Sequence, residues 1–235
     1  MIKTKKDPFN IDVSKDSWTL SVFHGEVRAI GEKTWRAIMR RDAYTCQRCG
    51  FISKQFQEVS HIDGDHRNKK ETNLECLCPL CHQCEHLPLA GKSKGAELIW
   101  LPEISQEALN LAAMTAMIAR LAPENSTWVE AGNQFFSMLR QRTYPVNNLL
   151  TQDGSNPYLL AQILLKASKE DKEKMKPNIQ ALRLLPRPLR FMPQSEYWSK
   201  AITKKNPYEN WVNLLSGEEL IRNMKEEKKK FNYDN

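Results

Sequence analysis

The chain has 235 residues, of which 40% are hydrophobic and 27% are charged, a balance typical of globular proteins. No apolar run approaches the ~20 residues that a membrane-spanning helix needs, and the lysine-rich start has no apolar stretch like that of a signal peptide, so we expect a cytoplasmic protein without a membrane span. Lys and Arg number 35 and Asp and Glu 28, but the excess is divided between both halves of the chain. A surface that follows a phosphate backbone gathers its charge into a dense stripe, so the composition favours a protein partner over nucleic acid.

The first third of the chain predicts strands, a helix and a turn. Apolar residues alternate over 18–23, so we expect a strand there, and residues 51–62 are expected to form a strand or hairpin. Residues 32–41 instead have the apolar spacing of a helix. Gly64, between two aspartates, can take the positive φ of a tight turn.

Two further elements follow this turn. Pro79 is suited to the first position of a short helix, which would carry His82 or both His82 and His86. Residues 98–101 form a short apolar strand that stops at Pro102. We therefore expect the first structural unit of the chain to end near this proline.

The remainder of the chain has helical spacing of its apolar residues, interrupted by prolines. Ser105 is suited to cap one helix, and Ser126 or Thr127 to cap the next. Further helices are expected over residues 158–168, 179–185, 196–202 and 217–231.

Two cysteine pairs with Cys-x-x-Cys spacing indicate a metal site. Cys46 and Cys49 form the first pair, and Cys78 and Cys81 the second. Each such turn directs two sulfur atoms to one point, so two turns complete a tetrahedral shell for structural Zn(II) with no open coordination position. The register of the second pair is open, because Cys84 follows Cys81 at the same spacing and is an alternative ligand to Cys78.

Three polar residues inside and just after the segment between these pairs match the site of an HNH-type nuclease. His61 stands at the place of the general base that deprotonates water, Asn73 at that of the residue supporting its loop, and His82 at that of a metal ligand. Such an enzyme needs a second, catalytic divalent metal. Ser60 departs from the pattern. The position just before the general base usually holds a metal-binding His or Asp, whereas the hydroxyl of Ser60 is a poor metal ligand. The set is either a working site or the remnant of one.

These observations predict the fold class and the domain organisation. The fold class is α+β, with a small HNH-like ββα zinc module, built on a four-cysteine site, followed by a mostly helical region. We expect residues 1–16 to be disordered, residues 17–102 to form the zinc module, and residues 103–235 to form the helical region.

Several segments together resemble one protein family more closely than HNH proteins at large. They are Arg41 to Phe51, Asp63-Gly64-Asp65 with Asn68 and Asn73-Leu74, Cys81-His82-Gln83-Cys84, Leu98 to Gln106, and Arg183-Leu184-Leu185-Pro186. The chain resembles the DotN/IcmJ proteins of type IVB (Dot/Icm) secretion systems over about residues 17–200. The segments outside the zinc module are the most specific, because an HNH domain alone would not carry them.

The resemblance implies a zinc scaffold that works as a subunit of the secretion system's coupling complex. Such a subunit would bind a tail segment of the coupling ATPase, together with other coupling-complex subunits, and support substrate export at the cytoplasmic face of the inner membrane. A pure scaffold would not require His61 and His82, which this chain keeps. Two functions therefore stand: an adaptor, and an HNH endonuclease that cleaves DNA.

As an adaptor, the protein would need a surface for its partner. Aromatic residues in the helical region and in the strand before it are candidates for the walls of an apolar groove: Trp100, Trp128, Phe135 and Phe136. Core packing is the alternative role for the same side chains.

Overall fold

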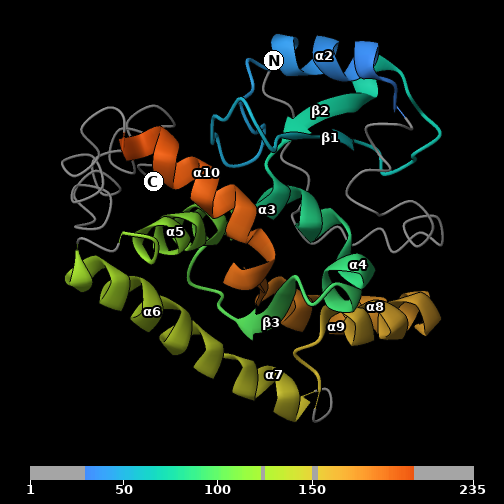
Figure 1. The fold of residues 1–235 in the computed structure, drawn as a ribbon. Helices are drawn as coiled ribbons and strands as arrows, with labels where there is room; N and C mark the ends of the chain where they lie inside the picture. Colours follow the sequence, from blue (N-terminus) through green and yellow to red (C-terminus); the bar gives the residue numbers. More distant parts are fainter. Residues whose placement is uncertain (1–29, 123–124, 150–152, 204–235) are drawn as a thin grey trace, which may run out of the picture.

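The computed structural model describes residues 30–122, 125–149 and 153–203 (Figure 1). The expectations for residues 1–16, 18–23 and 217–231 lie outside the described residues. Within these ranges, two small antiparallel sheets lie among helices, and the predicted α+β class with a four-cysteine cluster followed by helices is confirmed. No helix in the described part of the chain is both long enough and apolar enough to cross a membrane.

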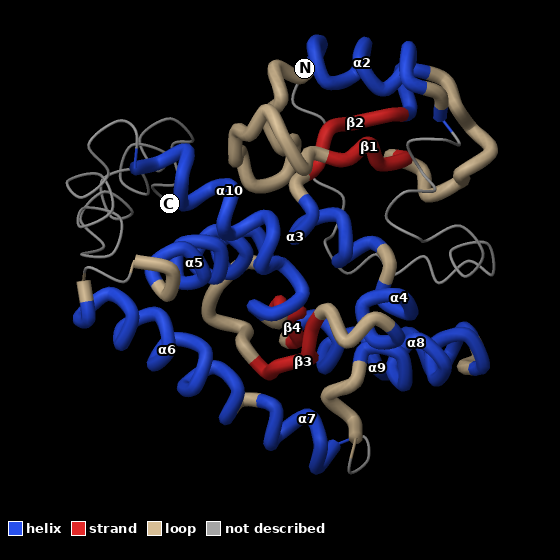
Figure 2. The backbone as a smooth tube through the Cα atoms, in the orientation of Figure 1, coloured by secondary structure: helices blue, strands red, loops and turns tan. Residues whose placement is uncertain are grey.

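The first sheet is a hairpin with a helix packed against it. Strand β1 (Glu58–His61) pairs with β2 (Leu74–Leu77), and α2 (Glu32–Arg41) lies beside them (Figures 1 and 2). The helix expected over residues 32–41 is confirmed, whereas the strand expected over 51–62 is reduced to its last part. The small core between these elements consists mainly of Ile38, Met39, Val59, Leu74 and Cys76.

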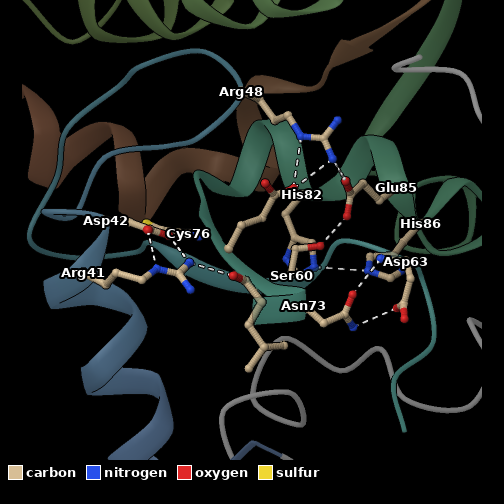
Figure 3. A network of polar contacts seen from close by, with 12 residues as sticks. Arg41, Asp42, Arg48, Ser60, Asp63, Asn73, Cys76, His82, Glu85 and His86 are labelled. Carbon is tan, nitrogen blue, oxygen red and sulfur yellow. Dashed lines mark hydrogen bonds and ion pairs between the residues drawn. The ribbon is translucent and has the colours of Figure 1, made fainter. Parts of the chain in front are cut away.

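Arg41, the last residue of α2, fastens the helix to the hairpin (Figure 3). Its guanidinium donates hydrogen bonds to the backbone carbonyls of Glu71 at 2.7 Å and Leu74 at 2.6 Å, and it pairs with the carboxylate of Asp42. Asp42 in turn accepts a hydrogen bond from the backbone N–H of Cys76 at 2.9 Å. The helix C-terminus is thus hydrogen-bonded to β2, the strand that leads into the second cysteine pair.

A run of short helices follows the hairpin. These are α3 (Pro79–His82), the 3-10 helix η3 (Gln83–Glu85) and α4 (Leu87–Lys92), while the 3-10 helix η2 (Glu71–Asn73) precedes β2. Pro79 begins α3 as predicted, because its missing N–H would have no partner there in any case. His82 ends α3, and His86 lies beyond it between η3 and α4.

The helix expected over residues 179–185 is wrong. Most of this segment is strand β4 (Leu182–Pro186), which pairs antiparallel with β3 (Ala96–Trp100). Three leucines of β4 are buried, and pairing with a strand far away in the sequence outweighs local propensity. The helix forms before the strand instead, as α9 (Lys169–Gln180), whose charged sequence contains no buried residue.

The remaining helices surround the second sheet. Ser105 caps α5 (Gln106–Ala119), as predicted, by accepting a hydrogen bond from the N–H of Ala108 at 3.1 Å. Helix α6 (Ser126–Gln141) is capped by Asn125 rather than by Ser126 or Thr127, because its side chain accepts from the N–H of Trp128. The others are α7 (Thr143–Leu149), α8 (Pro157–Lys166), the 3-10 helix η4 (Pro188–Phe191) and α10 (Met192–Thr203).

The main hydrophobic core joins the cysteine-bearing segments to the helices. It contains three of the cysteines together with side chains from α5, β4 and α10, among them Cys46, Cys78, Cys81, Leu109, Met114, Leu185 and Trp198. The ring of Trp198 packs edge-on against Phe51 at 5.2 Å, and its Nε1 donates to the hydroxyl of Ser53 at 3.3 Å. Helix α10 therefore closes over the loop that carries the first cysteine pair.

Candidate metal centre and histidine cluster

Four of the six cysteines gather where the hairpin meets the helices. The sulfur atoms of Cys46, Cys49, Cys78 and Cys81 all lie within 4.8 Å of one another. Three of these residues are buried, and Cys49 is partly exposed. They are the four residues that the sequence indicated as metal ligands.

A tight turn presents the first pair. The N–H of Gly50 donates to the carbonyl of Cys46 at 2.9 Å, and the N–H of Cys46 donates to the carbonyl of Phe51 at 2.8 Å. Gly50 has a φ of 77°, in the left-handed region that favours glycine, so the chain can reverse directly after Cys49. The turn thereby directs both sulfur atoms to the same side.

The first turn of α3 presents the second pair. Cys78 precedes this helix and Cys81 lies within it, and the N–H of His82 donates to the carbonyl of Cys78 at 2.9 Å. Residues three apart lie on one face of a helical turn. The two sulfur atoms therefore point together toward the first pair.

The cluster has the dimensions of a tetrahedral metal site. The sulfur atoms of Cys49 and Cys78 are 3.7 Å apart. Four sulfur atoms around Zn(II), each at ~2.3 Å from the metal, would be separated by about 3.8 Å, whereas a disulfide needs about 2.05 Å. The donor set fits a thiolate-bound metal such as Zn(II), which would supply four strong bonds and no open position for substrate.

The pKa values of three of the clustered thiols are shifted in opposite directions. Hydrogen bonds from the other three thiols lower the pKa of Cys46, whereas contacts within the cluster and burial raise the pKa of Cys78 and of Cys81 well above its ordinary value. One thiolate is thus favoured at the expense of the others. A bound divalent cation would remove this competition, because it attracts all four thiolates together.

The two remaining cysteines stand outside the cluster. The Cys84 thiol donates to the backbone carbonyl of Leu80 at 3.2 Å, and burial raises the pKa of Cys84 to about 12. Burial likewise raises the pKa of Cys76, on β2, to about 12. Both are neutral thiols, that of Cys76 buried and that of Cys84 partly buried, and the structure places Cys78 rather than Cys84 beside the first pair.

A partly buried ionic network extends from the first cysteine turn (Figure 3). Arg48, within that turn, donates to Glu75 of β2 at 2.9 Å and to Glu85 of η3 at 2.7 Å. The hydroxyl of Ser60 donates to the second carboxylate oxygen of Glu85. The Arg48 side chain is 16% exposed, so its charge compensates two carboxylates in surroundings that water screens poorly.

Four histidine rings lie next to one another, among them that of His61, which follows Ser60 in β1. The ring centroids of His61 and His66 are 4.7 Å apart, those of His66 and His86 5.4 Å, and those of His82 and His86 4.8 Å. The Nε2 atoms of His82 and His86 are 3.1 Å apart, and Nδ1 of His82 lies 2.6 Å from a carboxylate oxygen of Glu58. His61 and His82 are thus joined in one cluster through the rings of His66 and His86.

Asn73 holds the loop that follows His61. Its amide donates to the carboxylate of Asp63 at 2.8 Å and to the carbonyl of Asn68 at 2.9 Å, and its oxygen accepts from the N–H of Asp63. Burial opposes ionisation of Asp63, but hydrogen bonds from Asn68 and Asn73 outweigh it and lower the pKa of this carboxyl. These contacts are those of a residue that fixes a loop.

The polar partners in the ionic network and in the histidine cluster could be predicted only in part from the sequence. Arg48, Glu75 and Glu85 come from three separate segments, and nothing in the sequence pairs them. His66 also has no spacing signal, since it lies on the loop after β1. His86 did have a spacing signal, because it follows His82 by four residues, and residues four apart lie on the same face of a helix.

The fold and its cysteine cluster define a mixed helical and β protein with a candidate structural metal centre. No family model matches the chain. The chain is 30% identical over 167 residues to the type 4 apparatus protein DotN of Legionella pneumophila subsp. pneumophila (strain Philadelphia 1). The matched region covers 69% of this chain and 76% of that protein. The chain belongs to the DotN family. The resemblance described from the sequence is confirmed to that extent, while the HNH-like assignment stays a prediction.

The two possible registers of the second cysteine pair give opposite expectations for matched substitutions. We expect a chelator to lower the melting temperature of the wild type by removing the metal. In Cys78→Ser the metal site is already lost, so we expect a low melting temperature that the chelator does not change. Cys84→Ser should keep a chelator-sensitive melting temperature, since this thiol lies outside the cluster. Thermal unfolding with and without chelator measures both, and loss of sensitivity in Cys84→Ser alone would overturn the assignment.

The ionic network predicts a clear difference between two arginines. Replacing Arg48 with Met leaves Glu75 and Glu85 without their counter-charge, and we expect it to lower the free energy of unfolding by about 3 kcal/mol. The matched control is Arg67→Met, whose pair with Asp65 is exposed to solvent and should leave stability unchanged. Urea denaturation compares them, and equal midpoints would show that the network adds nothing.

Proposed function

We propose that this protein is a zinc-stabilised subunit of a type IVB secretion apparatus, and that it binds a tail segment of the coupling ATPase to support substrate export. The observation that carries the proposal is the relationship to the type 4 apparatus protein DotN over 76% of that protein. Within the apparatus, the subunit would sit in the coupling complex at the cytoplasmic face of the inner membrane, beside other coupling-complex subunits.

The polar network supports an adaptor rather than an enzyme. At the position where an HNH nuclease keeps a metal ligand, the hydroxyl of Ser60 is instead donated to Glu85, which Arg48 holds in place. A coordinating oxygen would have to give up this hydrogen bond, and a neutral hydroxyl gains little from a divalent cation in return. These contacts support a structural role for Ser60, Glu85 and Arg48.

The aromatic residues considered as groove walls pack largely into the interior. Phe136 is buried in the main core with Phe135 packed against it, and Trp100 packs against the second core. Trp100, Phe135 and Phe136 thus take the structural role that was their alternative, while Trp128, on α6, is half-buried. Two large apolar side chains that remain exposed lie on neighbouring helices, Met138 on α6 at 64% exposure and Tyr144 on α7 at 70%. The others, among them Leu189 at 82%, lie on separate segments of the described chain. We assign the tail-binding surface to helices α6 and α7, which run along one edge of the molecule (Figure 1).

Binding of the full chain to the purified cytoplasmic tail of the coupling ATPase from the same organism tests this proposal by calorimetry. We expect saturable binding by the wild type, and at least tenfold weaker binding by the double variant Met138→Glu/Tyr144→Glu, because exposed apolar anchors are lost. Ile52→Glu is the matched control, since Ile52 is 66% exposed elsewhere on the protein. No binding by the wild type would reject the proposed partner, whereas equal binding by the double variant would reject only the surface.

The histidine cluster favours a second candidate function, an HNH endonuclease that cleaves DNA by metal-dependent hydrolysis. His61 would act as general base, His82 as ligand of a second divalent metal, and Asn73 would fix the loop after His61. The close approach of His82 and His86 through their Nε2 atoms is also compatible with two ligands of one cation. Ser60 remains the residue that speaks against this candidate.

A plasmid-nicking assay decides between the two functions. The adaptor proposal predicts no cleavage of supercoiled DNA with Mg(II), Mn(II), Ni(II) or added Zn(II), and no difference between the wild type and His61→Ala. Ser60→Ala serves as a matched control at the neighbouring position. Metal-dependent nicking that disappears in His61→Ala but persists in Ser60→Ala would establish the endonuclease instead.

A further inference from the structure

A buried amide on α5 touches the cysteine cluster from the helical side. Asn110 is completely buried, and its Nδ2 lies 3.3 Å from the sulfur of Cys81 and 3.9 Å from that of Cys84. A polar side chain in this position needs hydrogen-bond partners, because burying an amide without them costs roughly 1–3 kcal/mol. The sulfur atom of Cys81 is the nearest acceptor for its N–H groups.

The orientation of this amide is fixed by a second buried amide, that of Gln106. The oxygen of Gln106 accepts from the backbone N–H of Leu184 at 2.7 Å, and its Nε2 donates to the carbonyl of the same residue at 2.9 Å. A backbone N–H can only donate and a backbone carbonyl can only accept, so Gln106 cannot be turned around. Its Nε2 also donates to the oxygen of Asn110 at 3.0 Å.

This chain of contacts leaves one arrangement for Asn110. Because its oxygen accepts from Gln106, its nitrogen must face the sulfur of Cys81. The direction of the hydrogen bond at the cluster is therefore set by the backbone of β4, through two side chains of α5. The contact is an N–H donated to a sulfur atom, and the reverse polarity is excluded.

An N–H group beside a metal-bound thiolate has a definite chemical effect. Four thiolates around one divalent cation carry a net negative charge, which is costly in a buried site. A hydrogen bond from an amide withdraws electron density from the sulfur, which stabilises the thiolate and makes it less nucleophilic. Arg48, which lies between Cys46 and Cys49 and is 16% exposed, adds a positive charge near the cluster.

We propose that Asn110 is a positioning residue of the metal centre, which donates a hydrogen bond to the Cys81 thiolate and is itself held by Gln106 and β4. The inference rests on the proposed metal site. Through this connection, metal binding stabilises the β3–β4 sheet and α5, and the helical region in turn tunes the metal–sulfur bond. The role lies outside both cysteine pairs.

Cobalt(II) replaces zinc in the test, because its thiolate charge-transfer absorption reports on the electron density at sulfur. In Asn110→Leu, which keeps the shape but removes the donor, we expect this absorption to move to lower energy and the affinity for Co(II) to fall about tenfold. Ser105→Ala is the matched control, because it removes the cap of α5 and weakens that helix without contacting sulfur. It should lower stability and leave the absorption in place.

A second variant keeps the test decisive if Asn110→Leu fails to fold. Gln106→Glu retains the acceptor for the N–H of Leu184 but, as a carboxylate, loses both donors, the one to the carbonyl of Leu184 and the one to Asn110. The Asn110 amide should then turn its nitrogen toward the carboxylate and present its oxygen to Cys81. We expect the same spectral shift in this nearly isosteric variant. A wild type that binds no Co(II) would overturn the metal site itself, whereas tight binding with unshifted absorption in both variants would overturn only the role of Asn110.

Discussion

The meeting of four sulfur atoms is the constraint on which the rest of the structure depends. The two cysteine pairs come from a loop after α2 and from the first turn of α3, and three of the four cysteines belong to the same core as α5, β4 and Trp198 of α10. A structural zinc ion contributes roughly 10–16 kcal/mol in small zinc domains at pH 7, as much as the whole stability of many proteins. The hairpin and the helices are therefore packed around a site that a metal would hold closed.

The polar groups around the cluster take their positions from it. Arg48 lies between Cys46 and Cys49, so the turn that supplies two sulfur atoms also directs a guanidinium toward Glu75 and Glu85. Glu85 then accepts from Ser60, which precedes the histidine cluster. The position where a nuclease would keep a metal ligand is thus part of an ionic network that begins at the cysteine turn.

The features that the sequence predicted correctly are those that depend on neighbouring residues. The helix at residues 32–41, the Ser105 cap, the turn at Gly64 and the two cysteine pairs each depend on residues close together in the sequence. Strand β4 could not be predicted in this way, because its leucines are buried by pairing with β3 from far upstream. The contacts of Arg48 and Asn110 depend likewise on the finished fold, since their partners lie on other elements.

The cysteine cluster has the donor set of a closed metal centre, which would hold a scaffold together without an open position for a reaction. X-ray absorption at the zinc edge of the purified full chain tests this claim most directly. We expect one zinc per chain, surrounded by four sulfur atoms at about 2.3 Å and by no nitrogen or oxygen. A shell that contains nitrogen from the histidine cluster, or a purified protein without zinc, would contradict it.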